Sequence, residues 1–319
     1  MVESRALGWP ATAIFARGVR HLVEVILHIG AHRTGTTSLQ RALNRNRRNL
    51  IQNRVAYWGP GVTRSGRFSG LLRGPGLEAG ETARRIARDR GVIALELQRL
   101  QARGLEALLI SEENILGSMG ANLRSGLLYP GLAERLGRFR AAFGDRCTRI
   151  GLAIRPLDAY WASALAYGLE AGVARFGAGT AAQLAGQPRN WRQVIADIAG
   201  AFPAAELLVW EFDRLKGRPN AQYRLLSGRR GSILGSGHAH NASPGRAALR
   251  ALLAERGSNA EAARIGTGDG RFMPFSARQR ESLAWRYQQD IDWLRECSRS
   301  TAPAGMPAGG QEFQLRGIA

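Results

Sequence analysis

Residues 23–40, with the sequence VEVILHIGAHRTGTTSLQ, decide the fold of this chain. Their first part is a short apolar run typical of a buried strand, and Leu39 and Leu43 begin the apolar face of a helix. Gly30 and Gly35 allow a tight turn between the two. The first N–H groups of such a helix point into the turn, where the helix dipole favours an anion. The stretch therefore predicts a binding site for phosphate or sulfate.

The cation of this turn differs from that of an ATP-binding loop. The loop G-x-x-x-x-G-K-[ST] carries a lysine directly after its second glycine, where this chain has threonine, and the basic residue here is Arg33. The wording H-I-G-x-x-[KR]-T-G-T-T-S-L-Q resembles the 5′-phosphosulfate loop of sulfotransferases that use 3′-phosphoadenosine-5′-phosphosulfate (PAPS), and it is most similar to their bacterial branch. The resemblance implies that the 5′-phosphosulfate is bound by Arg33, Thr34, Gly35, Thr36, Thr37 and Ser38, with Arg33 balancing charge on the leaving phosphate.

A second part of the expected donor site lies after another predicted strand. Residues 148–154 read as a strand, Arg155 follows it, and Ser163 falls on the next helix. Sulfotransferases carry an Arg and a Ser at this spacing, and the resemblance implies that the pair binds the 3′-phosphate of PAPS. The planar guanidinium suits bidentate contact with phosphate oxygens. The alternative is that Arg155 is a solvated residue at a helix start and Ser163 a filler between alanines.

Two carboxylates follow a third predicted strand. Glu112 and Glu113 come after the apolar residues 107–110, and ligands of open α/β sheets lie at the carboxyl ends of strands. Sulfuryl transfer to a hydroxyl needs a base, and related sulfotransferases place a His or Glu here, so Glu113 is our candidate. His32, inside the first loop, is the second candidate. Alternatively, the two acids cap the next helix or pair with arginines.

Strand and helix patterns alternate along the chain, with strands at about 23–29, 105–110, 148–154 and 205–210. This alternation predicts a single α/β domain with a central parallel β-sheet flanked by helices, of P-loop type according to the resemblance. Capping boxes predict two further helix starts, at Asn190 and Ser276. The expected divisions are an N-terminal extension (1–22), the sulfotransferase-like domain (23–297) and a disordered Pro- and Gly-rich tail (298–319).

Two Gly- and Arg-rich segments read as loops. Residues 59–80 predict a mobile surface loop whose arginines are either merely solvated or face an acidic acceptor. A later segment contains Arg229 and Arg230. Many sulfotransferases close over the adenosine and the 3′-phosphate with a late basic loop, and the resemblance implies that role for Arg230 or its neighbour.

The composition limits the possible partners and compartments. The formal net charge is +20, but Lys216 is the only lysine among 45 basic residues, a pattern typical of a GC-rich genome, so we predict no specific nucleic-acid partner. The two cysteines have no metal-ligand spacing, and we predict no metal. The chain shows no secretory signal and no apolar span of about 20 residues. We therefore expect a reduced, cytoplasmic protein.

The sequence thus predicts a PAPS-dependent sulfotransferase that transfers a sulfuryl group to a hydroxyl or amine. Its acceptor would be a glycan, a lipid or a small metabolite, with PAPS as the only co-substrate. Two other classes remain open. One is a phosphotransferase that uses Mg-ATP, with Glu112 holding the metal. The other is a non-catalytic protein that binds nucleotides or polyanions.

Overall fold

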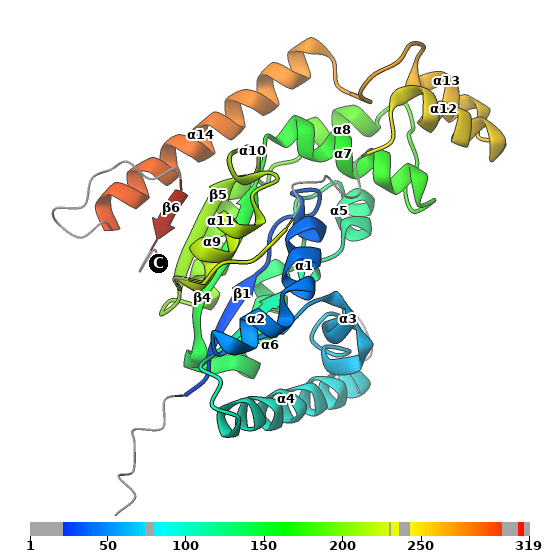
Figure 1. Ribbon diagram of the computed structural model, residues 1–319. Helices are drawn as coiled ribbons and strands as arrows, with labels where there is room; N and C mark the ends of the chain where they lie inside the picture. Colours follow the sequence, from blue (N-terminus) through cyan, green and yellow to red (C-terminus); the bar gives the residue numbers. More distant parts are fainter. Residues whose placement is uncertain (1–21, 74–78, 230, 236–242, 302–311, 316–319) are drawn as a thin grey trace, which may run out of the picture.

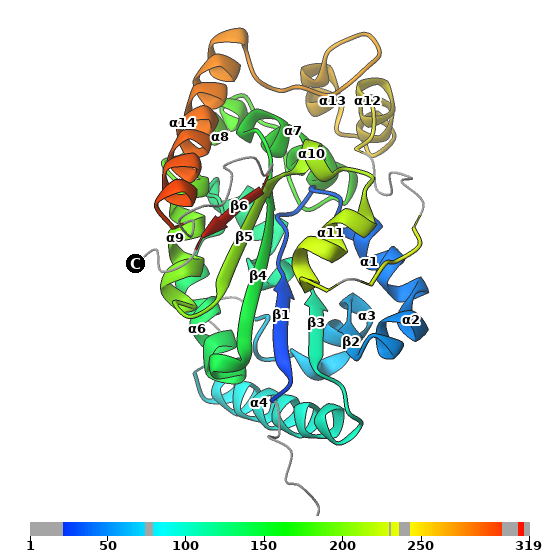
Figure 2. The same cartoon turned by 60° about the vertical axis from the view of Figure 1, so that its left-hand side comes forward.

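A six-stranded β-sheet forms the centre of the computed structural model, which describes residues 22–73, 79–229, 231–235, 243–301 and 312–315 (Figure 1). In spatial order the strands are β2 (Val55–Trp58), β3 (Ala107–Ser111), β1 (Glu24–His28), β4 (Cys147–Ile154), β5 (Glu206–Glu211) and β6 (Glu312–Leu315). The first five are parallel, and β6 pairs antiparallel with β5 at the edge (Figure 2). The predicted α/β class with a mostly parallel central sheet is confirmed.

Helices cover both faces of the sheet. One face packs against α1 (Thr36–Arg45), α2 (Arg47–Gln52) and α11 (Pro219–Ser227). The other packs against α4 (Ala79–Ala102), α6 (Leu132–Phe143), α7 (Leu157–Glu170), α9 (Trp191–Ala201) and α14 (Ala277–Thr301). The shorter elements are α3 (Pro60–Val62), η1 (Thr63–Arg67), η2 (Glu113–Ile115), α5 (Met119–Ser125), η3 (Gly144–Arg146), α8 (Thr180–Gly186), α10 (Phe212–Leu215), α12 (Arg246–Glu255) and α13 (Asn259–Ile265).

The strand residues alternate between two hydrophobic cores. In β1, Val25 and Leu27 belong to the larger core, whereas Ile26 between them belongs to the smaller core beneath α1 and α11. Successive side chains of a strand point to opposite faces, so a strand covered by helices on both sides is apolar throughout. This double coverage explains why the run at 23–29 carries no alternation of polar and apolar residues.

All four strands predicted from the sequence are confirmed, as β1, β3, β4 and β5. The two predicted capping boxes also form. The Asn190 side chain accepts from the N–H of Gln193, whose own side chain accepts from the N–H of Asn190. Ser276 and Gln279 exchange the same pair of hydrogen bonds at the start of α14. These local signals are reliable because the interacting residues are three positions apart.

Two predictions about irregular segments are wrong. Residues 59–73 were expected to begin a mobile loop, but they form α3, η1 and a packed turn in which the N–H groups of Gly70 and Leu71 donate to the buried Asp89 carboxylate. The predicted tail, 298–319, contains the last turn of α14 and the strand β6, whose Phe313 and Leu315 are buried. The predicted N-terminal extension lies outside the described residues except for its last residue.

Within the described ranges, no helix has both the length and the apolar character needed to cross a lipid bilayer.

Candidate functional site

The carboxyl end of the sheet carries a cavity of about 580 Å³. Residues that follow β1, β3, β4 and β5 all line it. β1 and β4 are neighbours, yet the chain leaves β1 toward β2 at one edge and leaves β4 toward β5 on the other side. Ligands of open α/β sheets bind where the chain departs in opposite directions from adjacent strands. The topology therefore makes this cavity the expected binding site of the fold.

The loop between β1 and α1 turns sharply at two residues with left-handed backbone. Gly35 has φ of +73° and Arg33 has φ of +65°. Helix α1 begins at Thr36, with no side-chain cap and no acidic residue in its first turn. Thr36, Thr37 and Ser38 line the cavity, so the positive end of the α1 dipole faces it without a neutralising carboxylate in the helix.

Gly35→Ala tests whether this turn needs glycine. A Cβ would both strain the backbone at φ +73° and lie 3.0 Å from Cε2 of Phe212. We expect the free energy of unfolding, measured with urea, to fall by about 1–2 kcal/mol from the backbone alone, and further from the contact. Gly104→Ala is the matched control, because Gly104 has the same φ but nothing within 4 Å of its Cβ position. Equal losses in the two variants would show that the Phe212 contact is not important.

The two predicted parts of the donor site form one cluster. The Nε of Arg33 donates to the Oγ of Ser163 at 3.0 Å, and an Nη of Arg155 donates to the carbonyl oxygen of Arg33 at 2.8 Å. The other end of the Arg33 guanidinium donates to the hydroxyl of Ser243 at 3.0 Å. The sequence analysis assigned Arg33 and Ser163 to opposite ends of PAPS, whereas here their side chains are in direct contact.

Positive charges crowd together in this cluster. Burial, together with the nearby charges of Arg271 and Arg33, lowers the pKa of Arg155 to about 10. Burial also lowers the pKa of Arg33. The Arg155 guanidinium stacks on the Phe212 ring at 5.2 Å, and its Nε is buried without a hydrogen-bond partner among the described residues. An anion placed between these guanidinium groups would relieve their repulsion.

Glu113 faces the cavity as an ionised, hydrogen-bonded carboxylate. One oxygen accepts from Nε2 of Gln40 and the other from Nη2 of Arg64, both at 2.8 Å. Burial favours the protonated acid, but the positive charge that His32 gains when it is protonated at low pH, the hydrogen bond from Arg64 and the Arg64 charge outweigh it, so the pKa of Glu113 lies below its ordinary value. The side chain is 15% exposed. It is therefore both accessible and charged at neutral pH.

Glu112 points away from the cavity. It is fully buried, and it accepts hydrogen bonds from the hydroxyl of Thr63, from two nitrogens of Arg64, and from the N–H of Asn114. The alternative from the sequence was that these acids cap the next helix or pair with arginines. Glu112 does both, and Glu113 pairs with the same Arg64. A carboxylate engaged in this way does not hold a magnesium ion in the cavity.

His32 lies at the wall of the cavity and is 9% exposed. Its Nδ1 is 3.2 Å from the hydroxyl of Tyr129, and its Nε2 is 3.2 Å from Oδ1 of Asn114. Its backbone N–H also donates to the Tyr129 hydroxyl, at 2.9 Å. Burial lowers the pKa of His32, against the raising effect of the nearby Glu113 charge. Both ring nitrogens are thus engaged by protein groups.

Not every predicted site residue reaches the cavity. Thr34 is buried, and its hydroxyl donates to the carbonyl oxygen of Ala31. Arg230 lies outside the described residues. The prediction for its neighbour Arg229 is wrong, because that guanidinium pairs with Glu24 and Glu106 at the amino ends of β1 and β3. Those strand ends are at the opposite edge of the sheet.

Several residues that line the cavity were not predicted as site residues. They are Tyr167, Phe212, Lys216, Arg218, Ser243 and Arg271. They come from separate parts of the chain, so the sequence around each one does not show that they meet.

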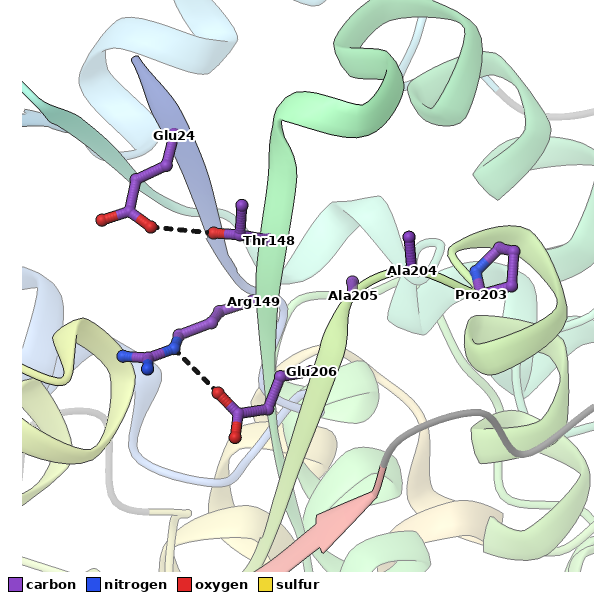
Figure 3. A pocket seen from close by; sticks show the side chains of 7 residues that line it. All are labelled: Glu24, Thr148, Arg149, Pro203, Ala204, Ala205 and Glu206. Carbon is purple, nitrogen blue, oxygen red and sulfur yellow. Dashed lines mark hydrogen bonds and ion pairs between the residues drawn. The ribbon is translucent and has the colours of Figure 1, made fainter. Parts of the chain in front are cut away.

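A second cavity, of about 310 Å³, lies at the amino ends of β1, β4 and β5 (Figure 3). Its polar side chains satisfy one another: Thr148 donates to Glu24, and Arg149 pairs with Glu206 at 2.9 Å (Figure 3). Paired charges of this kind leave little to attract a ligand, so the cavity at the carboxyl end is the candidate site.

Comparison with known proteins identifies no relative of this chain. No protein-family model, curated protein or solved structure matches the chain. Among the described residues, no group of three or more His, Cys, Asp and Glu side chains is arranged to hold a metal ion.

Proposed function

We propose that this chain is a PAPS-dependent sulfotransferase with its donor site in the cavity at the carboxyl end of the sheet. The observation that carries the proposal is that the loop before α1 and the pair Arg155 and Ser163 line the same cavity. These are the two parts that the family resemblance assigns to the donor, and they come from segments more than 100 residues apart. The fold brings them within hydrogen-bond distance of each other.

The charge of the cavity suits a nucleotide with several anionic groups. Its cationic lining consists of Arg33, Arg64, Arg155, Lys216, Arg218 and Arg271. Glu113 is the one carboxylate among the described lining residues. PAPS carries a phosphate on the ribose, a 5′-phosphate and a sulfate. Because Arg33 touches both predicted parts of the site, we assign its charge to the donor phosphates as a group.

The proposed reaction is an in-line displacement at sulfur. The acceptor oxygen forms a bond to sulfur while the bond from sulfur to the bridging phosphate oxygen breaks, and adenosine 3′,5′-bisphosphate leaves with the electron pair. The proton of the acceptor hydroxyl passes to the Glu113 carboxylate. The N–H groups at the start of α1 and the nearby guanidinium groups stabilise the charge on the leaving phosphate.

Binding of the product nucleotide tests the donor site directly. We expect adenosine 3′,5′-bisphosphate to raise the melting temperature more than equal concentrations of ADP or ATP, with or without Mg²⁺. Arg155→Ala should weaken binding of the bisphosphate about 100-fold in calorimetry, because truncating one member of a buried charge pair costs about 3 kcal/mol. The same variant should bind ADP with a smaller loss.

Arg149→Ala is the matched control for this experiment. It removes an arginine from the cavity at the amino ends of the strands and should leave nucleotide affinity unchanged. Preference for ADP with Mg²⁺ would instead favour the phosphotransferase. Equal affinity for pyrophosphate, ADP and the bisphosphate would favour a non-catalytic polyanion-binding protein.

A further inference from the structure

We propose that Tyr129 holds His32 as a neutral imidazole with its proton on Nε2, so that the ring donates a hydrogen bond at the cavity and is not the base. The inference deepens the proposed function and rests on it for the identity of the bound groups. It follows from the hydrogen bonds that Tyr129 and Asn114 make with the two ring nitrogens of His32.

The buried side chain of Asn122 holds the backbone of Tyr129 in place. The backbone N–H of Tyr129 can only donate, and it donates to the side chain of Asn122 at 3.1 Å, so the amide oxygen of Asn122 must face it. The amide NH2 of Asn122 therefore points the other way, toward the hydroxyl of Tyr160 at 2.8 Å. Asn122 is fully buried, so no exchange with solvent relaxes this orientation.

The hydrogen bonds of the Tyr129 hydroxyl have one consistent order. Among the described residues, its hydrogen-bond partners are the backbone N–H of His32, at 2.9 Å, and Nδ1 of the same residue, at 3.2 Å. The backbone N–H can only donate, so the Tyr129 oxygen accepts from it. The hydroxyl proton then points to the other partner, Nδ1 of His32.

This order decides the tautomer of His32. A neutral imidazole has one acceptor nitrogen and one donor nitrogen. Since Nδ1 accepts from Tyr129, the proton of the ring lies on Nε2 and points to Oδ1 of Asn114. The reverse order would leave the hydroxyl proton of Tyr129, which is fully buried, without an acceptor.

The surroundings keep the ring neutral. The charged groups that act on it are Glu113 and Glu112, which favour protonation, and Arg64, which opposes it. Burial outweighs them, so the pKa of His32 lies below its ordinary value. The rings of Tyr160 and Trp191 pack against Tyr129 at 6.3 and 6.4 Å between centroids, which holds the phenol in place.

A ring in this state has a specific use at the cavity. Its lone pair faces Tyr129 in the protein interior, so it does not take a proton from an acceptor. Its N–H makes only a long hydrogen bond to Asn114, and an oxygen of the transferred group can share it. Glu113 is then left as the base, and Tyr129 acts as a positioning residue through His32.

The tautomer can be measured without any nucleotide. In long-range proton–nitrogen NMR spectra of the full chain at pH 7, we expect His32 to show a protonated Nε2 and an unprotonated Nδ1, with the signals assigned by their loss in His32→Gln. The signals should titrate at a lower pH than those of a solvated imidazole, because burial lowers the pKa of His32. A charged ring, or a proton on Nδ1, would overturn the proposal even if the chain binds the bisphosphate.

Tyr129→Phe should lower the ratio of the Nε2–H tautomer to the Nδ1–H tautomer about tenfold, the effect of one lost hydrogen bond. Tyr57→Phe is the matched control, because it removes another buried hydroxyl near the site, one that meets only the carbonyl oxygen of Gln40 at 3.4 Å. An unchanged ratio in Tyr129→Phe would contradict the positioning role.

The donor role predicts different rates for two amides at position 32. Glutamine places an N–H near the position of Nε2, whereas asparagine places it near Nδ1. We expect His32→Gln to release adenosine 3′,5′-bisphosphate from PAPS within about tenfold of the wild-type rate, and His32→Asn to lose about 100-fold. Equal, large losses in both variants would mean that His32 takes the proton itself.

Discussion

Glu113→Gln is expected to lower the rate of sulfuryl transfer by about 10²- to 10⁴-fold, the usual contribution of a general base. The substitution keeps the shape of the side chain and an oxygen that can accept the hydrogen bond from Gln40 or Arg64, but the amide cannot take a proton. The rate would be measured as release of adenosine 3′,5′-bisphosphate from PAPS. The affinity for the bisphosphate should change less than about twofold, since an ionised carboxylate donates no hydrogen bond to a phosphate.

The control for this variant is Glu211→Gln. Glu211 also ends a strand at the carboxyl edge of the sheet, but it accepts from Arg214 and Tyr287 and does not line the cavity. Its variant should transfer at the wild-type rate. Undiminished transfer by Glu113→Gln would rule out this residue as the base.

The pH dependence of the rate follows from the direction of the Glu113 shift. Because the pKa of this carboxyl lies below its ordinary value, the base is ionised throughout the neutral range. The rate should therefore be flat from pH 6 to pH 8 and should fall only as the pH drops through the lowered pKa. The same group stabilises the fold above its unfolded pKa, and this contribution is lost at that low pH.

The parts of the site that could be predicted from the sequence are those that depend on residues close to one another in the chain. The turn at Gly35 and the start of α1 depend on residues within one loop, and Arg155 directly follows a clear apolar strand. The same holds for Glu113 at the end of β3. Each of these positions follows from a strand ending, and strand endings meet at one edge of a parallel sheet.

The parts that could not be predicted depend on contacts between distant segments. Lys216, Arg218 and Arg271 line the cavity because the chain after β5 and the segment before α14 fold back over it. β6 forms because its backbone pairs with the edge strand β5 and because it packs against α14. A segment of four residues with turn-forming neighbours carries no such signal by itself.

The segment 59–73 was mistaken for a mobile loop for a related reason. Its Gly, Arg and Ser content is typical of a solvated surface segment, but Thr63 and Arg64 are ordered by a partner nearly 50 residues away, the buried Glu112. The composition of a segment indicates whether it would be ordered in isolation. It does not show that a buried carboxylate elsewhere in the chain needs hydrogen-bond donors from that segment.

Arg64→Ala is expected to lower the free energy of unfolding by about 3 kcal/mol. Arg64 donates to Glu112 through Nε at 3.0 Å and through Nη2 at 2.6 Å, and Glu112 is fully buried. Removing the guanidinium leaves a buried carboxylate with only the Thr63 hydroxyl and the N–H of Asn114 as donors. Urea denaturation should show a lower midpoint with an unchanged slope.

Arg85→Ala provides the comparison, because Arg85 pairs with Glu81 one helical turn away and both side chains are 40% or more exposed. Exposed pairs of this kind contribute at most about 1 kcal/mol, so this variant should unfold close to the wild-type midpoint. If both variants lose the same small amount, Glu112 is not held by Arg64 in solution. Adding Glu112→Gln to Arg64→Ala should restore part of the lost stability, because the amide removes the uncompensated charge while keeping the contact to Thr63. That recovery separates the electrostatic contribution of Arg64 from its packing contribution.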